Sequence, residues 1–283
     1  MHSHLHRSQI ISTLVILVLA AISSLLGVFR PGHYQAAPEL VESYQVQDIT
    51  ILVVGIPVVA AGLRYAVRNS PRGRIVWLGG LAYMTYMWFS ISIQIPFNEL
   101  FLVYIVLAGL SLFTFVSGLV TTDVNTIHQA LGGRINPSLY SGALAVIGVG
   151  LATLWLSDIV PPLLSGTTPP LIEEAGPQAM ASHVIDLGIV VPSIIVAAAW
   201  LYQERPWGYV FAGVVLVLGA TLAAPIGVMT LVLMAGETVS ISPIAALFTF
   251  LPIVVSALLA VTYLYSMEGQ THLPPDGDGR QSA

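Results

Sequence analysis

The chain has 283 residues, of which 56% are hydrophobic and 8% are charged, and its formal net charge is −5. Because soluble domains carry roughly 25% charged residues, this composition excludes a soluble globular enzyme, a disordered scaffold and a nucleic-acid-binding domain. The absence of Cys and Lys also excludes disulfides, thiolate metal sites, retinal or pyridoxal Schiff bases and a Walker A lysine. We expect no cofactor, and the sequence leaves any bound metal unknown.

Eight apolar runs have lengths close to the roughly 20 residues that a helix needs to cross a bilayer. They cover residues 10–29, 49–67, 75–93, 100–120, 138–156, 187–202, 208–234 and 243–267. The first run is longer than the core of a signal peptide, so we expect it to be retained as a helix. The polar residues 269–283 predict a disordered cytoplasmic tail. The predicted fold class is an all-α integral membrane protein with eight transmembrane helices in the cell membrane.

The arginines predict the orientation, because basic residues favour the cytoplasmic side of a membrane. With both termini in the cytoplasm, eight of the nine arginines are cytoplasmic and Arg30 alone lies outside. The densest basic patch comprises Arg64, Arg68, Arg72 and Arg74. Its first predicted role is to set the topology. Binding of anionic lipid headgroups at the inner leaflet is a second role, and docking of a soluble partner is a third.

The order of long loops and helices suggests a duplication of a four-helix unit. The predicted halves are residues 1–134 and 135–268, with the second helix matched to the sixth. A shift of 137 positions aligns seven identical residues, beginning with Val53 and Val190 and ending with Arg68 and Arg205. An even number of helices in each unit predicts halves of the same orientation, related by an axis along the membrane normal.

A proline interrupts each of the two matched helices, Pro57 in the second and Pro192 in the sixth. Pro225 and Pro252 lie in later apolar runs. Because proline frees a backbone carbonyl, such residues can mark broken helices that line a transporter's binding site. The alternative is a simple kink that helix packing tolerates.

Two short segments resemble a family of uncharacterised prokaryotic multi-pass membrane proteins. They are IPFNELFLVY at residues 95–104, which has the pattern PFNxLFLVY, and RPWGYVFAG at residues 205–213, which contains RPWGY. No activity is connected with this family. The resemblance therefore implies an integral membrane protein of unknown role, and it carries no catalytic residues onto this chain.

Four residues form a candidate cation or proton site near the outer ends of the predicted helices: Asp48, Glu99, His183 and Asp186. Ionisable groups in or near a bilayer are costly and often functional. If the second and sixth helices meet, Asp48 and Asp186 face each other at an external mouth. The alternative is that each of these carboxylates caps the N-terminus of its own helix.

An aromatic stretch predicts a pocket for a lipid or another hydrophobic solute. Its candidate lining residues are Tyr83, Tyr86, Trp88, Gln94 and Asn98. The alternative explanation is core packing or an aromatic belt at the membrane interface.

Three classes of function follow from these patterns. The first is a permease-like carrier of a small solute or ion with an acidic outer mouth. The second is a non-catalytic assembly or sensory subunit of a membrane complex, and the third is a membrane-embedded enzyme. No catalytic motif favours an enzyme, and no catalytic residue is predicted. The expected partners are the lipid bilayer, anionic lipids and a homo- or hetero-oligomer, with no nucleic acid.

Overall fold

The computed structural model describes residues 4–235 and 243–267, and all regular elements in these ranges are helical. In chain order they are α1 (Arg7–Phe29), α2 (Pro38–Thr50), the π-helical segment η1 (Ile51–Gly55), α3 (Ile56–Ala66), α4 (Pro71–Gln94), α5 (Phe101–Val120), α6 (Val124–Leu131), α7 (Pro137–Ser165), α8 (Pro170–Ala175), the 3₁₀ turn η2 (Pro177–Met180), α9 (Ala181–Ile185), the π-helical segment η3 (Asp186–Val190), α10 (Val191–Tyr202), α11 (Pro206–Ala235) and α12 (Pro243–Tyr265).

Seven helical segments of the described chain are long and apolar enough to cross a membrane. The all-helical fold is confirmed, and the apolar helices fit a multi-pass membrane protein. The expected eighth span corresponds to α12, of which only Val254–Tyr265 falls among the residues tested for this property. The predicted tail, 269–283, lies outside the described residues.

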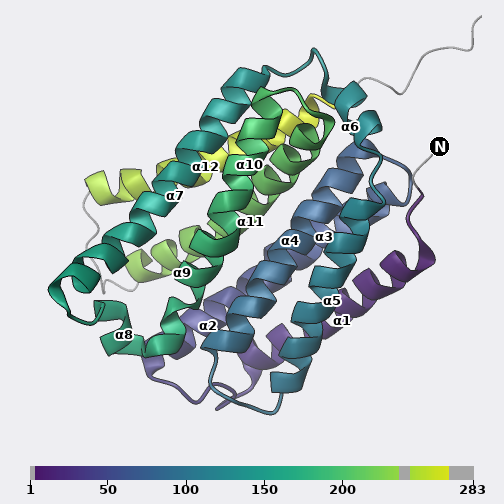
Figure 1. Cartoon of the computed structure of the whole chain (residues 1–283). Helices are drawn as coiled ribbons and strands as arrows, with labels where there is room; N and C mark the ends of the chain where they lie inside the picture. The colour runs from purple at the N-terminus through teal and green to yellow at the C-terminus, as the bar shows by residue number, and fades with distance from the viewer. Residues whose placement is uncertain (1–3, 236–242, 268–283) are drawn as a thin grey trace, which may run out of the picture.

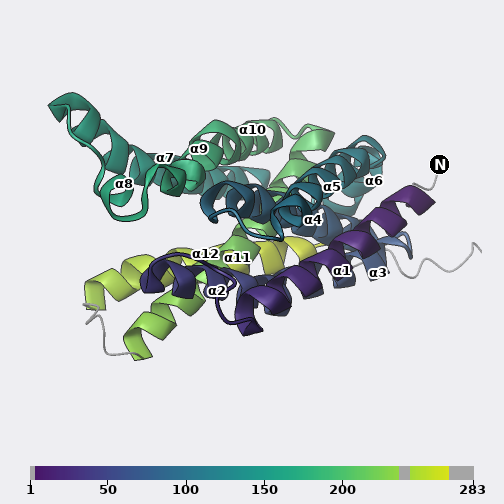
Figure 2. The ribbon, with the colours of Figure 1, turned by 90° about the horizontal axis from the view of Figure 1, so that it is seen from below.

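The helices form two groups that meet along α4 and α11. In one group α4 packs between α3 and α5, and in the other α11 packs between α10 and α12. Figure 2 shows α1, α2, α11 and α12 in one layer and α5, α7, α9 and α10 in the other. Two further contacts are equivalent, because α4 touches α9 while α11 touches α2. The two central helices therefore join the halves.

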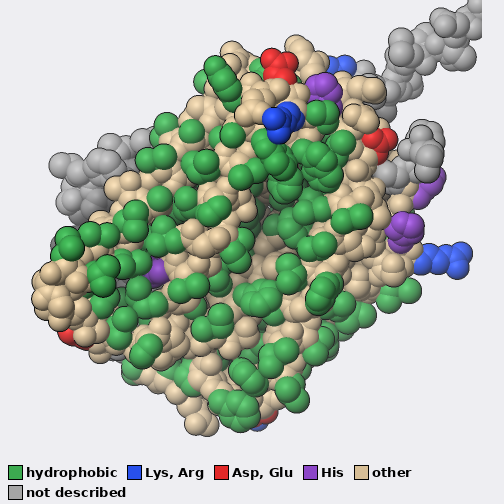
Figure 3. All heavy atoms as spheres, in the orientation of Figure 1, with side chains coloured by type: hydrophobic (Ala, Val, Ile, Leu, Met, Phe, Trp, Pro, Cys, Tyr) green, Lys and Arg blue, Asp and Glu red, His purple; other side chains and the backbone are tan. Residues whose placement is uncertain are grey.

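Burial separates the central helices from those that face the surroundings. In the most apolar window of α4, 67% of the residues are buried, against 11% in that of α7. Trp77, Tyr83 and Trp88 of α4 are fully buried. Apolar side chains cover the middle of the face in Figure 3, and charged side chains lie at its periphery. An apolar belt of this kind matches the hydrocarbon core of a bilayer.

The two ends of the bundle differ in charge. Gln9 and Arg74 both donate hydrogen bonds to the Thr121 hydroxyl, and Arg72 donates to the Leu264 carbonyl. The start of α1 and the end of α12 therefore lie together at what we call the arginine end. The opposite end, called the acidic end, holds Asp48 and its neighbours. Both described ends of the chain lie at the arginine end.

Each of the two proline-containing spans continues through a π-helical segment. The Ile56 amide bonds the carbonyl of Ile51, and the Val191 amide bonds that of Asp186, five residues back in each case. Pro57 and Pro192 follow directly. Because proline has no N–H and its ring clashes with the carbonyl four residues back, a wide turn lets the helix proceed without a break. The side chains of Pro225 and Pro252 lie outside the described set.

Similar backbone features of the second and sixth spans recur 135 residues apart, whereas the predicted duplication aligned these spans at a shift of 137. Both π segments and both following prolines are 135 residues apart. The connections after these spans also match, because Asn69 and Glu204 have positive φ angles of 60° and 53°. The two separations differ by two residues, and the duplication itself stays a prediction.

Two matched glycines provide a test of this pairing. A Cβ atom on Gly73 would overlap Tyr65, and one on Gly208 would overlap the backbone at Leu201. We expect Gly73→Ala and Gly208→Ala to destabilise the protein by similar amounts, about 1–3 kcal/mol each, because neither helix connection has room to relax. Thermal unfolding in detergent measures this. Gly142→Ala in α7, where nothing lies within 4 Å, is the matched control. Equal stability of all three variants would contradict the equivalence.

Candidate functional site

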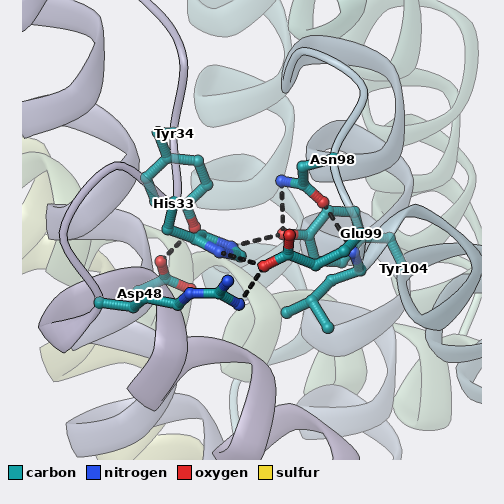
Figure 4. Close-up of polar contacts among 8 residues, drawn as sticks. His33, Tyr34, Asp48, Asn98, Glu99 and Tyr104 are labelled. Carbon is teal, nitrogen blue, oxygen red and sulfur yellow. Dashed lines mark hydrogen bonds and ion pairs between the residues drawn. The ribbon is translucent and has the colours of Figure 1, made fainter.

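A buried carboxylate, Asp48, belongs to a polar cluster at the acidic end (Figure 4). Asp48 lies near the end of α2 and is 2% exposed. Its Oδ2 atom accepts a hydrogen bond from the Tyr34 hydroxyl. Gly27 of α1 faces the carboxylate, and a Cβ atom there would overlap it. A close approach of the α1 backbone therefore helps to enclose this carboxylate.

A chain of polar groups connects Asp48 with the exterior. Glu99 is 52% exposed and its Oε1 atom lies 3.7 Å from Nδ1 of the buried His33. The other ring nitrogen, Nε2, lies 3.1 Å from the Tyr104 hydroxyl. The hydroxyls of Tyr104 and Tyr34 are neighbours, and no hydrogen bond joins them among the contacts of the described chain. The order of the chain is therefore Glu99, His33, Tyr104, Tyr34 and Asp48, and we call it the Asp48 relay.

The outer members of the relay are positioned by the loops that follow α1 and α4. Arg30 forms an ion pair with Glu99. Asn98 donates a hydrogen bond to the Tyr104 hydroxyl at 3.2 Å and accepts one from the Leu100 amide at 2.9 Å. These contacts hold Glu99 and Tyr104 on either side of His33.

The two loop residues of the relay titrate outside their ordinary ranges. Burial lowers the pKa of His33, and the nearby Glu99 carboxylate partly offsets this effect. Burial and the adjacent Asp48 raise the pKa of the Tyr34 hydroxyl well above its usual range. His33 is therefore neutral near pH 7, and a neutral imidazole has one donor and one acceptor nitrogen. This is the form that can pass a proton from one nitrogen to the other.

The second half of the chain builds a related cluster. His183 is 2% exposed, and its Nε2 atom lies 3.5 Å from Oδ2 of Asp158, whose side chain is 54% exposed. Asp186 follows one helical turn after His183, and its Oδ2 atom accepts a 2.8 Å hydrogen bond from the Trp155 indole. The Tyr86 hydroxyl of α4 lies near Asp186. We call this set the Asp186 cluster.

The two clusters share one chemical order, in which an exposed carboxylate touches a buried histidine that lies near a buried carboxylate. The capping alternative for Asp48 and Asp186 is wrong. α2 begins at Pro38, well before Asp48, and Asp186 lies within a continuous helical span. Their carboxylates accept hydrogen bonds from Tyr34 and Trp155, which are side-chain donors from other parts of the fold.

The four predicted site residues therefore divide into two pairs. Asp48 and Glu99 belong to the Asp48 relay, and His183 and Asp186 belong to the Asp186 cluster. Within the described chain, no contact joins Asp48 directly to Asp186. A direct pairing of these two acids across the axis of the molecule stays a prediction.

The predicted pocket residues occupy several environments. Tyr83 and Trp88 are fully buried, and the Trp88 ring stacks on Tyr104 with centroids 6.0 Å apart. Tyr86 lies near Asp186, Asn98 donates a hydrogen bond to Tyr104 of the Asp48 relay, and the Gln94 carbonyl accepts a hydrogen bond from Tyr44. A cavity of about 250 Å³ opens at the acidic end, lined by residues 27–34 with Val41 and Gln45. This cavity lies directly outside Tyr34.

The structure also divides the basic patch. Arg64 and Arg68 are exposed on the arginine end. Arg72 is half-buried, and its guanidinium lies 5.4 Å from the centroid of the Tyr265 ring. Arg74 is buried, with 5% of its surface exposed. Of these four arginines, only Arg64 and Arg68 are therefore exposed at this end.

Sequence reasoning missed five residues that complete the two clusters: His33, Tyr34, Tyr104, Trp155 and Asp158. His33 and Tyr34 lie in an irregular connection, where hydropathy carries no periodic signal. Trp155 and Asp158 lie three residues apart near the end of α7, a helical spacing that places them on one face. That spacing was the available signal.

No family model, curated protein or solved structure matches this chain. Its function is therefore argued from the geometry of the site. Among the described residues, no group of three or more His, Asp or Glu side chains could hold a metal ion. The arrangement of Asp48, its tyrosines and His33 is suited to proton transfer.

Proposed function

We propose that this protein is a permease-like carrier of a small solute or ion in the cell membrane, driven by protons that enter at the acidic end. The observation that carries the proposal is the Asp48 relay, which runs from an exposed carboxylate to one that is 2% exposed. Ionisable groups at membrane depth often mark proton relays in pumps and transporters.

Each member of the relay has the chemistry that proton transfer needs. A neutral imidazole and a phenol can each accept one proton while donating another, and the terminal carboxyls bind and release protons. Hydrogen-bond reach is the geometric condition for such transfer. Two links meet this condition: His33 with Tyr104 at 3.1 Å, and Tyr34 with Asp48. Within the described chain no hydrogen bond joins His33 to Glu99 or Tyr104 to Tyr34, so proton transfer at these two steps needs a bridging water. Glu99, at 3.7 Å from His33, is the member that exchanges protons with water.

We propose further that the chain has eight spans and arose by duplication, with halves 1–134 and 135–268 of the same orientation. The matched π segments, the matched connections and the equivalent contacts of α4 and α11 support this. The two described chain ends at the arginine end fit an even number of spans. Under the positive-inside rule this end is cytoplasmic, which places the Asp48 relay outside.

Movement of one half against the other is the mechanism we propose for transport. Parallel repeats in known transporters rock about a shared interface. Here that interface is formed by α4 and α11, where Gly79 leaves space for the Val217 side chain. A glycine at a helix crossing allows close approach and a change of angle. Protonation of Asp48 removes a buried charge at the acidic end of this bundle. It can therefore change which of the two relative positions of the halves is favoured.

The proposal is tested with purified protein in liposomes that enclose a pH-sensitive dye. Gradients of alkali cations, amino acids and neutral sugars are imposed in turn. We expect at least one of these gradients to drive proton movement faster than in protein-free liposomes, because a proton-coupled carrier moves protons whenever it moves its solute. Proton movement identical to that of protein-free liposomes for the whole panel would overturn the proposal.

A second candidate function is a non-catalytic subunit of a membrane complex, favoured by the mostly exposed apolar surface of α7. In a complex a partner helix covers this surface, whereas in a carrier lipid covers it. The mass of the particle purified in mild detergent distinguishes the two. For either function, Arg64 and Arg68 are proposed to contact anionic lipid headgroups at the inner leaflet.

A further inference from the structure

A buried arginine at the opposite end of the bundle is held in a polar frame. The Arg74 Nε atom donates to the Thr122 hydroxyl at 3.1 Å. Its Nη2 atom donates to the Thr121 hydroxyl at 2.7 Å and to the Gly118 carbonyl at 3.3 Å. The guanidinium carbon lies 5.2 Å from the centroid of the Trp77 ring. These contacts fix the position of the cation between α4 and α5.

One edge of this guanidinium has no partner. Nη1 of Arg74 is buried and forms no hydrogen bond, and within the described chain no carboxylate lies within ion-pair distance of the side chain. Arg74 is 5% exposed. A buried charge without a counter-charge is strongly unfavourable. The neighbouring hydroxyls and carbonyl stabilise it only as dipoles.

A small cavity adjoins Arg74. It measures about 30 Å³, which is close to the volume that one water molecule takes up in the liquid. Its lining residues are Ala66, Asn69, Ser70, Pro71, Arg74, Thr122, Asp123, Thr126 and Ile127. The N-terminus of the 24-residue helix α4, capped by Ser70, lies at this cavity. The positive end of the helix dipole and the guanidinium therefore act on the same small volume.

Asp123 is the acidic residue of this lining, and its charge is already engaged. Its Oδ1 atom accepts hydrogen bonds from the Asn125 and Thr126 amides, and its Oδ2 atom accepts one from the Thr126 hydroxyl. This carboxylate caps α6, and these bonds lower the pKa of Asp123. Its charge offsets the dipole of α6 and leaves the charge of Arg74 uncompensated.

We propose that this cavity binds a monatomic anion of the chloride class, held by the Arg74 guanidinium and favoured by the positive end of the α4 dipole. The size of the cavity favours a single atom over a phosphate or a carboxylate group. The bound anion supplies the counter-charge that Arg74 lacks and ties α4, α5 and α6 together at the arginine end. The proposal is independent of proton transport, because it rests on stability and binding at the end away from Asp48.

The first experiment measures thermal unfolding of the full-length protein in detergent, at constant pH and ionic strength, with chloride replacing gluconate. A ligand that binds only the folded state raises Tm in a saturable way. We expect a rise of about 2–4 °C for the wild type, none for Arg74→Gln, and an unchanged rise for Arg68→Gln, an exposed arginine at the same end. Asp123→Asn keeps a capping side chain but removes a negative charge, so it should reach saturation at a lower chloride concentration.

A second experiment keeps the proposal falsifiable if Arg74→Gln does not fold. Iodide quenches tryptophan fluorescence on contact, and Trp77 lies beside Arg74. Wild-type protein should show a saturable quenching component that chloride competes away and that Trp77→Phe lacks. Quenching that is linear in iodide for both proteins, together with a Tm insensitive to chloride, would show that water alone fills the cavity. Stabilisation by inorganic phosphate but not by chloride would overturn the choice of a monatomic anion.

Discussion

Asp48→Asn is expected to abolish solute-linked proton movement in liposomes while leaving the protein folded. Asparagine has nearly the same shape as aspartate and its amide oxygen can still accept the hydrogen bond from Tyr34. It cannot bind and release a proton near neutral pH. Because positioned proton transfer contributes about 10²–10⁴-fold to a rate, we expect the proton flux to fall at least about a hundredfold.

The control for Asp48→Asn is Glu42→Gln, on the same helix α2. Glu42 is exposed, so its neutralisation changes the net charge equally without touching the relay. Its proton flux should equal that of the wild type. If Asp48→Asn retains wild-type flux at equal reconstitution, Asp48 carries no proton. Asp186→Asn then shows whether the Asp186 cluster serves this role.

Gly62→Leu is expected to prevent the formation of the native bundle. Gly62 lies where α3 crosses α4, and a Cβ atom there would overlap the backbone of Trp77. A rigid backbone cannot move aside as a flexible side chain can, and Trp77 is fully buried behind it. Overpacking typically costs about 1–3 kcal/mol and more where relaxation is blocked, so we expect a loss above about 3 kcal/mol.

The measurement for Gly62→Leu is the yield of monodisperse protein in mild detergent, followed by thermal unfolding of any folded fraction. Gly109→Leu in α5 is the matched control, because nothing lies within 4 Å of a Cβ atom at that position. The control should behave like the wild type. A Gly62→Leu protein as stable as the control would mean that α3 and α4 are not held this closely.

Hydropathy alone identified the membrane class and most of the helices. The predicted start of the first span, Ile10, lies three residues from the observed Arg7, and both end at Phe29. A bilayer imposes one length and one composition on every span, so local sequence carries this information. The prolines also indicated an irregularity in two spans. Whether each helix broke, kinked or widened depended on hydrogen bonds that the sequence does not show.

The pairing of the halves needed three-dimensional information. Apolar residues repeat by chance, and the identities around Val53 and Val190 favoured a shift two residues away from the separation of the matching backbone features. Two backbone features recur 135 residues apart: the positive φ angles at Asn69 and Glu204, and the lack of room for a Cβ atom at Gly73 and Gly208. These are properties of backbone geometry, which two different sequences can share.

The sequence by itself identified Asp48, His183 and Asp186 as ionisable residues near the helix ends, and the structure buries all three. Only the tertiary structure decided their partners. Tyr34 comes from an irregular loop, Tyr104 from α5 and Trp155 from α7, and the packing of distant helices brings each to a buried carboxylate. Such contacts depend on side-chain positions between segments, for which a single sequence has no periodic signal.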